Sequence, residues 1–204
     1  NEPDCELGQS DLEVAIKRFG CLRIDQLRFL DQRTHPVGLL AGLTPPDVEC
    51  ELYDDRIEPI PYDEPTDLVA LTVEIYTARR AYEIAEQYRL RGVPVIMGGF
   101  QPTLMPDECR RHADSIFIGD AEPLWHQVVD DARRGRLRGV YRARPGTPQP
   151  HGVQPRRDLY RGKGYLPVSL MQFSRGCRFR CDFCAISVFF AGAILPGVLL
   201  SGLY

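Results

Sequence analysis

The sequence predicts an α/β protein with a doubly wound parallel sheet of the Rossmann-like kind. Uninterrupted apolar runs of strand length recur at residues 68–73 (LVALTV), 93–97 (VPVIM) and 115–118 (SIFI). Such runs are typical of parallel strands covered on both faces. Helical patterns with short links separate them, and strand–helix–strand units of this kind build parallel sheets through right-handed crossovers.

The region before the first apolar run is less regular. Apolar residues at mixed helical spacing predict two short helices within residues 11–31, separated at Gly20. Residues 49–53 (ECELY) alternate between polar and apolar side chains, which predicts one strand. Prolines at positions 59, 61 and 65 indicate a turn-rich connection after it.

The helix after residue 73 has a clear start and a clear end. Thr77 is a residue type that caps helices, and Gly92 is expected to stop this one after Arg91. A second amphipathic helix is predicted over residues 122–133, after the strand at 115–118. Ligands of such sheets bind at the carboxyl ends of the strands, so we expect a site at residues 72–77, 98–103 and 119–122.

Length and composition indicate a packed globular protein. The chain has 204 residues, of which 44% are hydrophobic and 26% charged. A net charge of -3 gives no electrostatic reason to bind nucleic acid. The acidic, polar start lacks the features of a secretory signal, so we expect a reducing, cytoplasmic location.

The chain is predicted to contain two domains and a linker. Residues 1–141 form the α/β domain, and the proline- and glycine-rich stretch 142–165 reads as the linker. Residues 166–204 begin a second domain with a strand at 166–173 (LPVSLMQF). The uncharged ending 185–204 contains Pro196 and several glycines, so we interpret it as a truncated or frame-shifted end and expect no association with membranes.

Three of the seven cysteines lie within eight residues. Cys177, Cys181 and Cys184 follow the predicted strand at CxxxCxxC spacing, which lets three soft sulfur donors turn toward one metal centre. In a cubane, three thiolates leave one iron open to a substrate. The rival interpretations are three unrelated buried thiols or a zinc site, but zinc requires a fourth ligand, and no Cys or His follows Cys184.

The segment VSLMQFSRGCRFRCDFC resembles the signature of radical S-adenosylmethionine (SAM) enzymes, and in particular their cobalamin-dependent branch. The resemblance implies a [4Fe-4S] cluster on the three cysteines, SAM chelated to the fourth iron with Phe183 beside its adenine, and the start of an incomplete β/α barrel. It further implies cleavage of SAM to a 5′-deoxyadenosyl radical and methyl transfer to an unactivated carbon. An electron donor such as flavodoxin or ferredoxin is implied as a partner.

The upstream segment 67–122 resembles the cobalamin-binding domain that precedes such barrels. Glycines at strand ends would let a flat, bulky cofactor lie against the backbone, and nearby polar groups would bond its amides. The cobalamin contacts implied are Thr72, Glu74, Gly98, Gly99, Gln101, Gly119 and Glu122. His35 is a weaker candidate cobalt ligand, because Arg33 stands at the position of the Asp that would accept a hydrogen bond from the other ring nitrogen.

No catalytic side chain is assigned. The substrate is expected to be a small molecule, lipid or tetrapyrrole-like. The alternative function is a non-catalytic cobalamin- or nucleotide-binding module with a metal-binding tail, or a zinc-binding interaction protein.

Overall fold

The computed structural model describes residues 26–30, 36–148, 150, 152–165 and 174–196. Its centre is a six-stranded sheet with the strand order β2-β1-β3-β4-β5-β6. Every neighbouring pair in this sheet is parallel. The strands are β1 (Gln26–Leu30), β2 (Glu49–Tyr53), β3 (Leu68–Thr72), β4 (Val95–Gly98), β5 (Ser115–Ile118) and β6 (Val140–Arg142).

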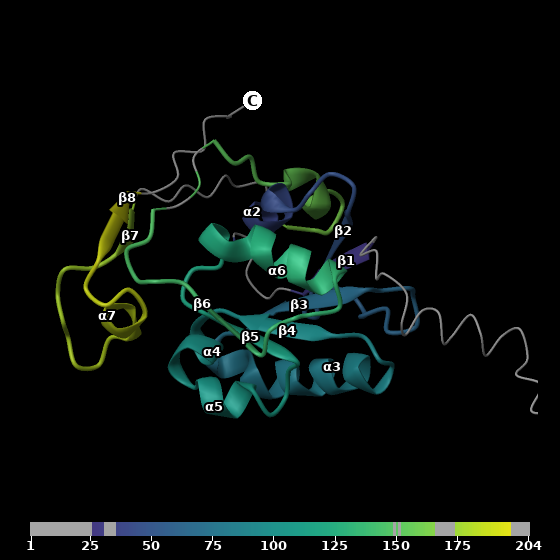
Figure 1. Cartoon of the computed structure of the whole chain (residues 1–204), viewed down its shortest axis with the longest axis horizontal. Coiled ribbons are helices and arrows are strands. Elements are labelled where there is room, and N and C mark those ends of the chain that lie inside the picture. The colour runs from purple at the N-terminus through teal and green to yellow at the C-terminus, as the bar shows by residue number, and fades with distance from the viewer. Residues whose placement is uncertain (1–25, 31–35, 149, 151, 166–173, 197–204) are drawn as a thin grey trace, which may run out of the picture.

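Helices cover both faces of the sheet, as predicted (Figure 1). One face carries α2 (Pro36–Leu43) and α6 (Trp125–Arg133), and the other carries α3 (Ala78–Leu90), α4 (Phe100–Leu104) and α5 (Pro106–Cys109). Alternate residues of one strand therefore point into two separate cores. In β3, Leu68 and Ala70 belong to the core under α2 and α6, whereas Val69 and Leu71 belong to the core under α3.

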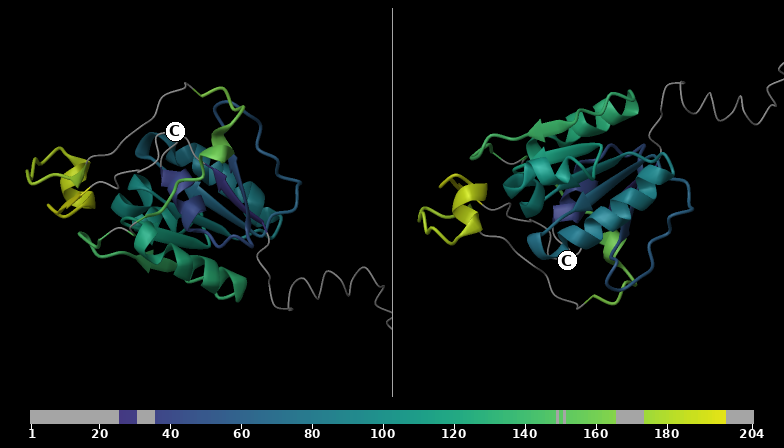
Figure 2. Two further views of the ribbon diagram at one scale, coloured as in Figure 1. Left: turned by 90° about the horizontal axis from the view of Figure 1, so that it is seen from above. Right: turned by 90° about the horizontal axis from the view of Figure 1, so that it is seen from below.

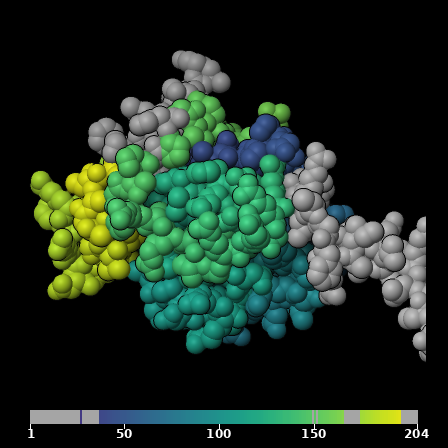
Figure 3. Space-filling model, in the orientation of Figure 1, coloured from purple at the N-terminus to yellow at the C-terminus, as the bar shows by residue number. Residues whose placement is uncertain are grey.

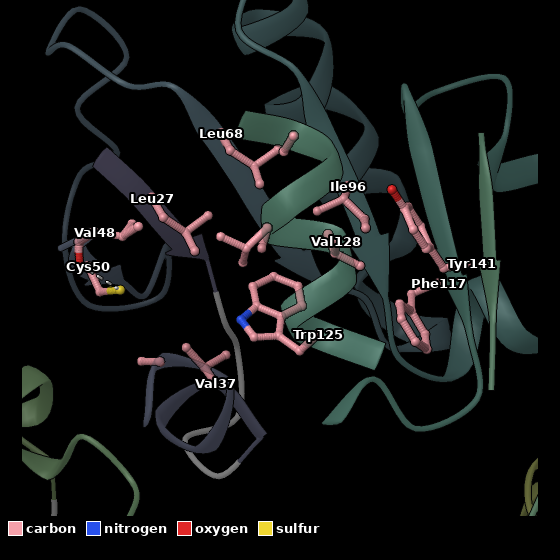
Figure 4. Close-up of a cluster of buried hydrophobic side chains, with 14 of the residues drawn as sticks. Leu27, Val37, Val48, Cys50, Leu68, Ile96, Phe117, Trp125, Val128 and Tyr141 are labelled. Carbon is pink, nitrogen blue, oxygen red and sulfur yellow. Dashed lines mark hydrogen bonds between the residues drawn. The ribbon is translucent and has the colours of Figure 1, made fainter. Parts of the chain in front are cut away.

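Trp125 is the centre of the first core (Figure 4). Its ring lies between the sheet and Val37 of α2, and its indole N–H donates to Thr44 Oγ1 at 2.9 Å. This bond satisfies the polar atom of a side chain that is only 2% exposed. The tryptophan thus fixes α2 against α6 at the end of the sheet where the strands finish.

The helix boundaries after β3 and after β5 agree with the sequence, although Thr77, at the N-cap position of α3, makes no side-chain cap hydrogen bond to that helix. A 3₁₀ turn at Ile75–Thr77 leads into α3, and the Thr77 hydroxyl donates to the Glu74 carbonyl at 3.1 Å. Gly92 follows the helix with a φ of +76°, a conformation that suits glycine. The predicted helix at 122–133 is a 3₁₀ turn, Glu122–Leu124, continued by α6.

Two strands of the sheet differ from the sequence-based expectation. Residues 26–30, predicted as part of a helix, form β1, and the rest of that prediction lies outside the described residues. Leu27 and Leu30 have helical spacing, but β1 is the strand between β2 and β3, so its long-range pairing decides its structure. The three-residue edge strand β6 was not predicted, because so short a segment has no detectable period.

Residues 152–165, which we call the strap, pack back on the α/β domain. The amide of Arg156 donates to the Gly38 carbonyl at 2.9 Å, and the Gly38 amide donates to the Tyr160 hydroxyl at 2.8 Å. Farther along, Lys163 bonds Glu58 at 2.7 Å and Tyr165 donates to Asp54 at 2.9 Å. The stretch predicted as a linker is therefore attached to α2 and to the loop after β2.

The C-terminal segment, residues 174–196, lies at one end of the body (Figures 2 and 3). Strands β7 (Ser174–Gly176) and β8 (Ile194–Pro196) form an antiparallel ribbon, with α7 (Ala185–Phe189) between them. The predicted strand at 166–173 falls outside the described residues, and the part that is described forms this ribbon rather than a β/α barrel. No helix in the described ranges is long and apolar enough to cross a membrane.

Candidate functional site

A pocket of about 320 Å³ opens at the carboxyl ends of β3, β4 and β5, where the sequence predicted a site. Its wall is mostly apolar and is built from the sheet, from α2 and α6, and from the C-terminal segment. The lining residues are Leu39, Leu40, Ala70, Leu71, Thr72, Glu74, Ile96, Gly98, Gly99, Phe100, Phe117, Gly119, Asp120, Ala121, Glu122, Trp125, Pro155, Arg175, Ile186, Phe189 and Phe190. Apolar walls with a few polar groups are typical of small-molecule sites.

A second hollow, of about 590 Å³, lies over the outer side of α6. Its lining is charged and open to solvent, and includes Asp130, Arg134 and Arg138. Such a surface gives a ligand little apolar contact, so the strand-end pocket is the stronger candidate.

Six of the seven residues predicted from the sequence as cofactor contacts line the strand-end pocket. They are Thr72, Glu74, Gly98, Gly99, Gly119 and Glu122. The structure therefore brings them together, while their contact with a ligand stays a prediction. Gln101 is the exception: it is buried outside the pocket lining, and its amide nitrogen donates to the Tyr82 hydroxyl at 3.2 Å.

The two adjacent glycines in the pocket wall have different roles. Gly99 has φ +107° and ψ −160°, and an added Cβ would lie 2.8 Å from the Val73 carbonyl oxygen. This position therefore requires glycine for the turn from β4 into α4. An added Cβ at Gly98 would meet only Phe117, at 3.8 Å, so the missing side chain there leaves open space in the pocket.

A buried ionic cluster forms the polar edge of the pocket. Arg175 Nη1 donates to Glu122 Oε1 at 2.6 Å and lies 3.3 Å from Asp120 Oδ1. Burial, and secondly the Glu122 carboxylate, raise the pKa of Asp120 to about 6, while Arg175 opposes the shift. The pKa of Arg175 is raised because the two carboxylates outweigh its burial, so the guanidinium keeps its charge.

The other edge of the pocket is aromatic. Phe189 of α7 and Phe100 of α4 have ring centroids 4.7 Å apart, and Phe189 and Phe190 are 4.8 Å apart. Phe189, the last residue of the five-residue α7, and Phe190, which follows it, are both almost fully buried. These rings attach the C-terminal segment to the rim of the sheet and present flat surfaces to the cavity.

The three clustered cysteines all lie in one loop, residues 177–184, which we call the cysteine loop. Cys181 is exposed and Cys177 and Cys184 are partly exposed. Across the described residues, no three His, Cys, Asp or Glu side chains are arranged to hold a metal ion. The donor chemistry thus fits a thiophilic metal, whereas the loop as described does not bring the three sulfurs to one centre.

Phe183, predicted beside a SAM adenine, is 93% exposed and lies outside the pocket lining. Its role stays a prediction, and His35 lies outside the described residues. Sequence reasoning missed Arg175, Phe189 and Phe190 as pocket residues. Arg175 is separated from Glu122 by 53 residues, and no local pattern indicates such a pair.

Comparison with known proteins shows what the chain is similar to. It is 35% identical over 159 residues to a bacteriochlorophyllide d C-8(2)-methyltransferase of Chlorobaculum tepidum, covering 72% of this chain and 34% of the relative. A bacteriochlorophyllide d C-12(1)-methyltransferase of the same organism is 28% identical over 152 residues, covering 72% and 33%. An uncharacterized methyltransferase of Synechocystis is 30% identical over 160 residues, covering 76% and 30%.

The relatives are methyltransferases by name. The chain spans about a third of their length. No family profile matches the sequence. A solved N-terminal domain of a hypothetical Thermotoga maritima protein is 22% identical and covers 42% of this chain and 74% of its own, with a TM-score of 0.35, which is too low to support an argument.

These relatives correct the family and function predicted from the resemblance. None is named as a cobalamin-binding or radical SAM protein, and two are named for methyl transfer to bacteriochlorophyllide. The prediction of a radical enzyme with a four-iron cluster and cobalamin is therefore replaced. The alternative, a non-catalytic binding module or zinc-binding interaction protein, is corrected too, because the relatives are named as enzymes. A short cysteine motif does not by itself decide a family.

Proposed function

We propose that this chain is part of a methyltransferase whose acceptor is a bacteriochlorophyllide-like tetrapyrrole and whose methyl donor is SAM. The observation that carries the proposal is the 35% identity to the C-8(2)-methyltransferase over 159 residues. That match covers 72% of this chain, so it must include more than half of the α/β domain. The expected tetrapyrrole-like substrate agrees with this proposal.

The strand-end pocket supports the proposal by its chemistry. Its walls are apolar and partly aromatic, which suits a flat ring system, and Gly98 leaves room for such a ring beside the sheet. The polar edge at Asp120, Glu122 and Arg175 suits the hydrogen-bonding groups that such a ring carries. We propose that this pocket binds a ring of one of the two reactants, and binding experiments with each reactant distinguish them.

Trp125 provides a direct measurement of pocket occupancy. It is the only tryptophan of the chain and it lines the pocket. Titration with SAM and, separately, with bacteriochlorophyllide d should change its fluorescence in a saturable manner for the reactant that binds there. In the Gly98→Leu variant, whose side chain occupies the cavity, the same titration should require at least about tenfold more ligand, a loss of about 1.4 kcal/mol.

A matched control is Gly139→Leu. An added Cβ at Gly139 has open space around it, and this residue does not line the pocket. Its titration should match that of the wild type. Saturable binding of neither reactant, or equal binding by wild type and Gly98→Leu, contradicts the pocket assignment.

Methyl transfer itself is tested with SAM that carries an isotope-labelled methyl group. Incubation of the protein with this SAM and bacteriochlorophyllide d, followed by mass spectrometry of the pigment, should show the label on the pigment. Label that stays in SAM under conditions where the pigment is bound argues against the proposed activity.

We also propose that Cys177, Cys181 and Cys184 bind a thiophilic metal. Support comes from three thiols within one loop, all at least partly accessible to solvent. Titration with Co²⁺ under reducing conditions should produce the absorption of cobalt–thiolate bonds. The signal should disappear in the triple alanine variant and persist when the buried Cys50 and Cys109 are replaced instead. A signal that persists in the triple alanine variant and disappears when Cys50 and Cys109 are replaced would place the metal elsewhere.

A further inference from the structure

The cysteine loop is bracketed by residues of the strand-end pocket. Arg175 lies two positions before Cys177, and Ile186 lies two positions after Cys184, and both line the pocket. Phe189 and Phe190 line it as well, immediately downstream. The loop that carries the three thiols is therefore held at both of its ends by the wall of the cavity.

The attachment at the first end runs through the side chain of Arg175. The Nη1 atom of Arg175 reaches both Glu122, at 2.6 Å, and Asp120, at 3.3 Å. The Arg175 side chain is 13% exposed and that of Glu122 only 5%, so this ion pair is mostly removed from water. The carboxylates belong to the loop after β5, and the arginine belongs to β7. The cluster thus connects the sheet to the C-terminal segment.

The attachment at the second end is apolar. Phe189 packs on Phe100 of α4, with ring centroids 4.7 Å apart. A contact of this kind is less directional than the charge-assisted hydrogen bond between Arg175 and Glu122. The arginine is therefore the more specific of the two connections.

We propose that Arg175 is a positioning residue that couples occupancy of the strand-end pocket to the arrangement of the cysteine loop. The inference rests on the proposed ligand of that pocket. A bound ring fills the space beside Arg175 and excludes water from the ion pair. Electrostatic attraction strengthens as water leaves, so the guanidinium is held more firmly and the loop behind it becomes more ordered.

Coupling between two sites is reciprocal. If a filled pocket orders the cysteine loop, then a metal held by the loop raises the affinity of the pocket for its ligand by the same factor. In coupled proteins, occupancy of one site commonly changes the affinity of the other site by about 5- to 150-fold. Arg175 would in this way make binding at one site favour binding at the other.

The test uses alkylation of the cysteines by iodoacetamide, followed by mass spectrometry of each thiol in the full chain. Cys50 and Cys109 are buried and serve as internal standards for global unfolding. The Gly98→Leu variant places a side chain inside the pocket without any ligand, so the result does not depend on which reactant binds. The coupling proposal can therefore fail this test even if the chain is part of a methyltransferase. It can also pass the test if the methyltransferase proposal fails.

In the wild-type background, Gly98→Leu should slow alkylation of the cysteine loop at least about fivefold. In an Arg175→Met background the same change should alter the rate less than about twofold, because the connection is gone. Arg175→Lys keeps the charge and should restore part of the effect. Arg178→Met removes an exposed arginine of the same loop and should leave the fivefold effect intact.

The alkylation rates differ if Arg175 only stabilises the fold and does not couple the pocket to the cysteine loop. Arg175→Met would then speed alkylation by the same factor whether the pocket is filled or not. That outcome overturns the proposal, as does an unchanged rate on filling the pocket of the wild type. If Arg175→Met exposes Cys50 and Cys109 as well, the comparison is made with Glu122→Gln, which weakens the ion pair and retains the arginine.

Discussion

Gly98 and Gly99 stand side by side in the pocket wall, yet a methyl group has a different effect at each. At Gly99 it meets the Val73 carbonyl oxygen in a backbone conformation that other residues rarely adopt. We expect Gly99→Ala to reduce the free energy of unfolding by about 1–3 kcal/mol. Urea denaturation monitored by circular dichroism measures this.

Gly98→Ala is the matched control for that experiment. Its new methyl group is 3.8 Å from Phe117 and its φ is not positive, so we expect a change within about 0.5 kcal/mol. Equal losses for the two variants would show that the turn after β4 does not depend on the left-handed conformation of Gly99.

Asp120 makes stability depend on pH in a predictable direction. Its pKa is raised from 3.8 to about 6, first by burial and then by Glu122. The folded protein therefore keeps a proton that the unfolded chain has already released. Its contribution to stability is complete below the unfolded value of 3.8 and is lost as the pH rises through about 6.

The variant Asp120→Asn isolates this effect, because asparagine stays neutral at every pH. Between pH 4 and pH 7 the wild type should lose about 1–3 kcal/mol of unfolding free energy relative to the variant. Urea titrations at several pH values give the difference. Parallel stability curves would mean that Asp120 ionises normally.

Several pocket residues were predictable one by one from the sequence. Thr72, Gly98 and Gly119 end apolar runs, and the ends of parallel strands meet at one edge of a sheet. Arg175 was not predictable, because its partners are distant in sequence and its neighbours suggest only a metal loop. Gln101 follows β4 as closely as the others do, but the turn at Gly99 directs it into the core.

At the level of elements, the strap and α2 depend on each other through two glycines. An added Cβ at Gly42 would collide with the carbonyl oxygen of Gln154, and one at Gly38 would lie 2.8 Å from the Tyr160 hydroxyl. The strap crosses α2 at the positions where the helix has no side chains. This contact places Pro155 in the pocket wall.

Gly42→Ala tests this packing, since the helix alone would gain from the change. Alanine is favoured over glycine inside helices by about 1 kcal/mol. We expect a net loss of about 1–2 kcal/mol instead, because the strap must move away. Denaturation gives the sign, and faster proteolytic cleavage within residues 152–165 would locate the effect. A stabilised protein with an intact strap contradicts the expected contact.

Predictability also differed among the elements. The runs forming β3, β4 and β5 are apolar without interruption, and both faces of each strand are buried, so the apolar composition predicts the structure correctly. The β1 segment QLRFL carries the charged Arg28 at its centre, so its sequence shows no uninterrupted apolar run. Its structure follows from pairing with β2 and β3, whose partner residues are 23 and 41 positions farther along the chain.

For the whole molecule, the parallel sheet and the C-terminal ribbon should differ greatly in local stability. Two-stranded ribbons are marginal by themselves, whereas β3 has a neighbour on each side and helices on both faces. We expect amides of residues 174–196 to exchange with deuterium at least about 100-fold faster than those of β3 and β4. Hydrogen exchange with mass spectrometry measures the ratio. Equal protection would mean that the ribbon unfolds only with the sheet.

The pair at positions 98 and 99 also bears on how related proteins diverge. Position 99 is fixed by the geometry of the chain, while position 98 tolerates a larger side chain without distorting the backbone. If the pocket binds a ring as proposed, a change in the size of residue 98 alone would alter which molecule fits, while the turn at residue 99 and the sheet stay as they are.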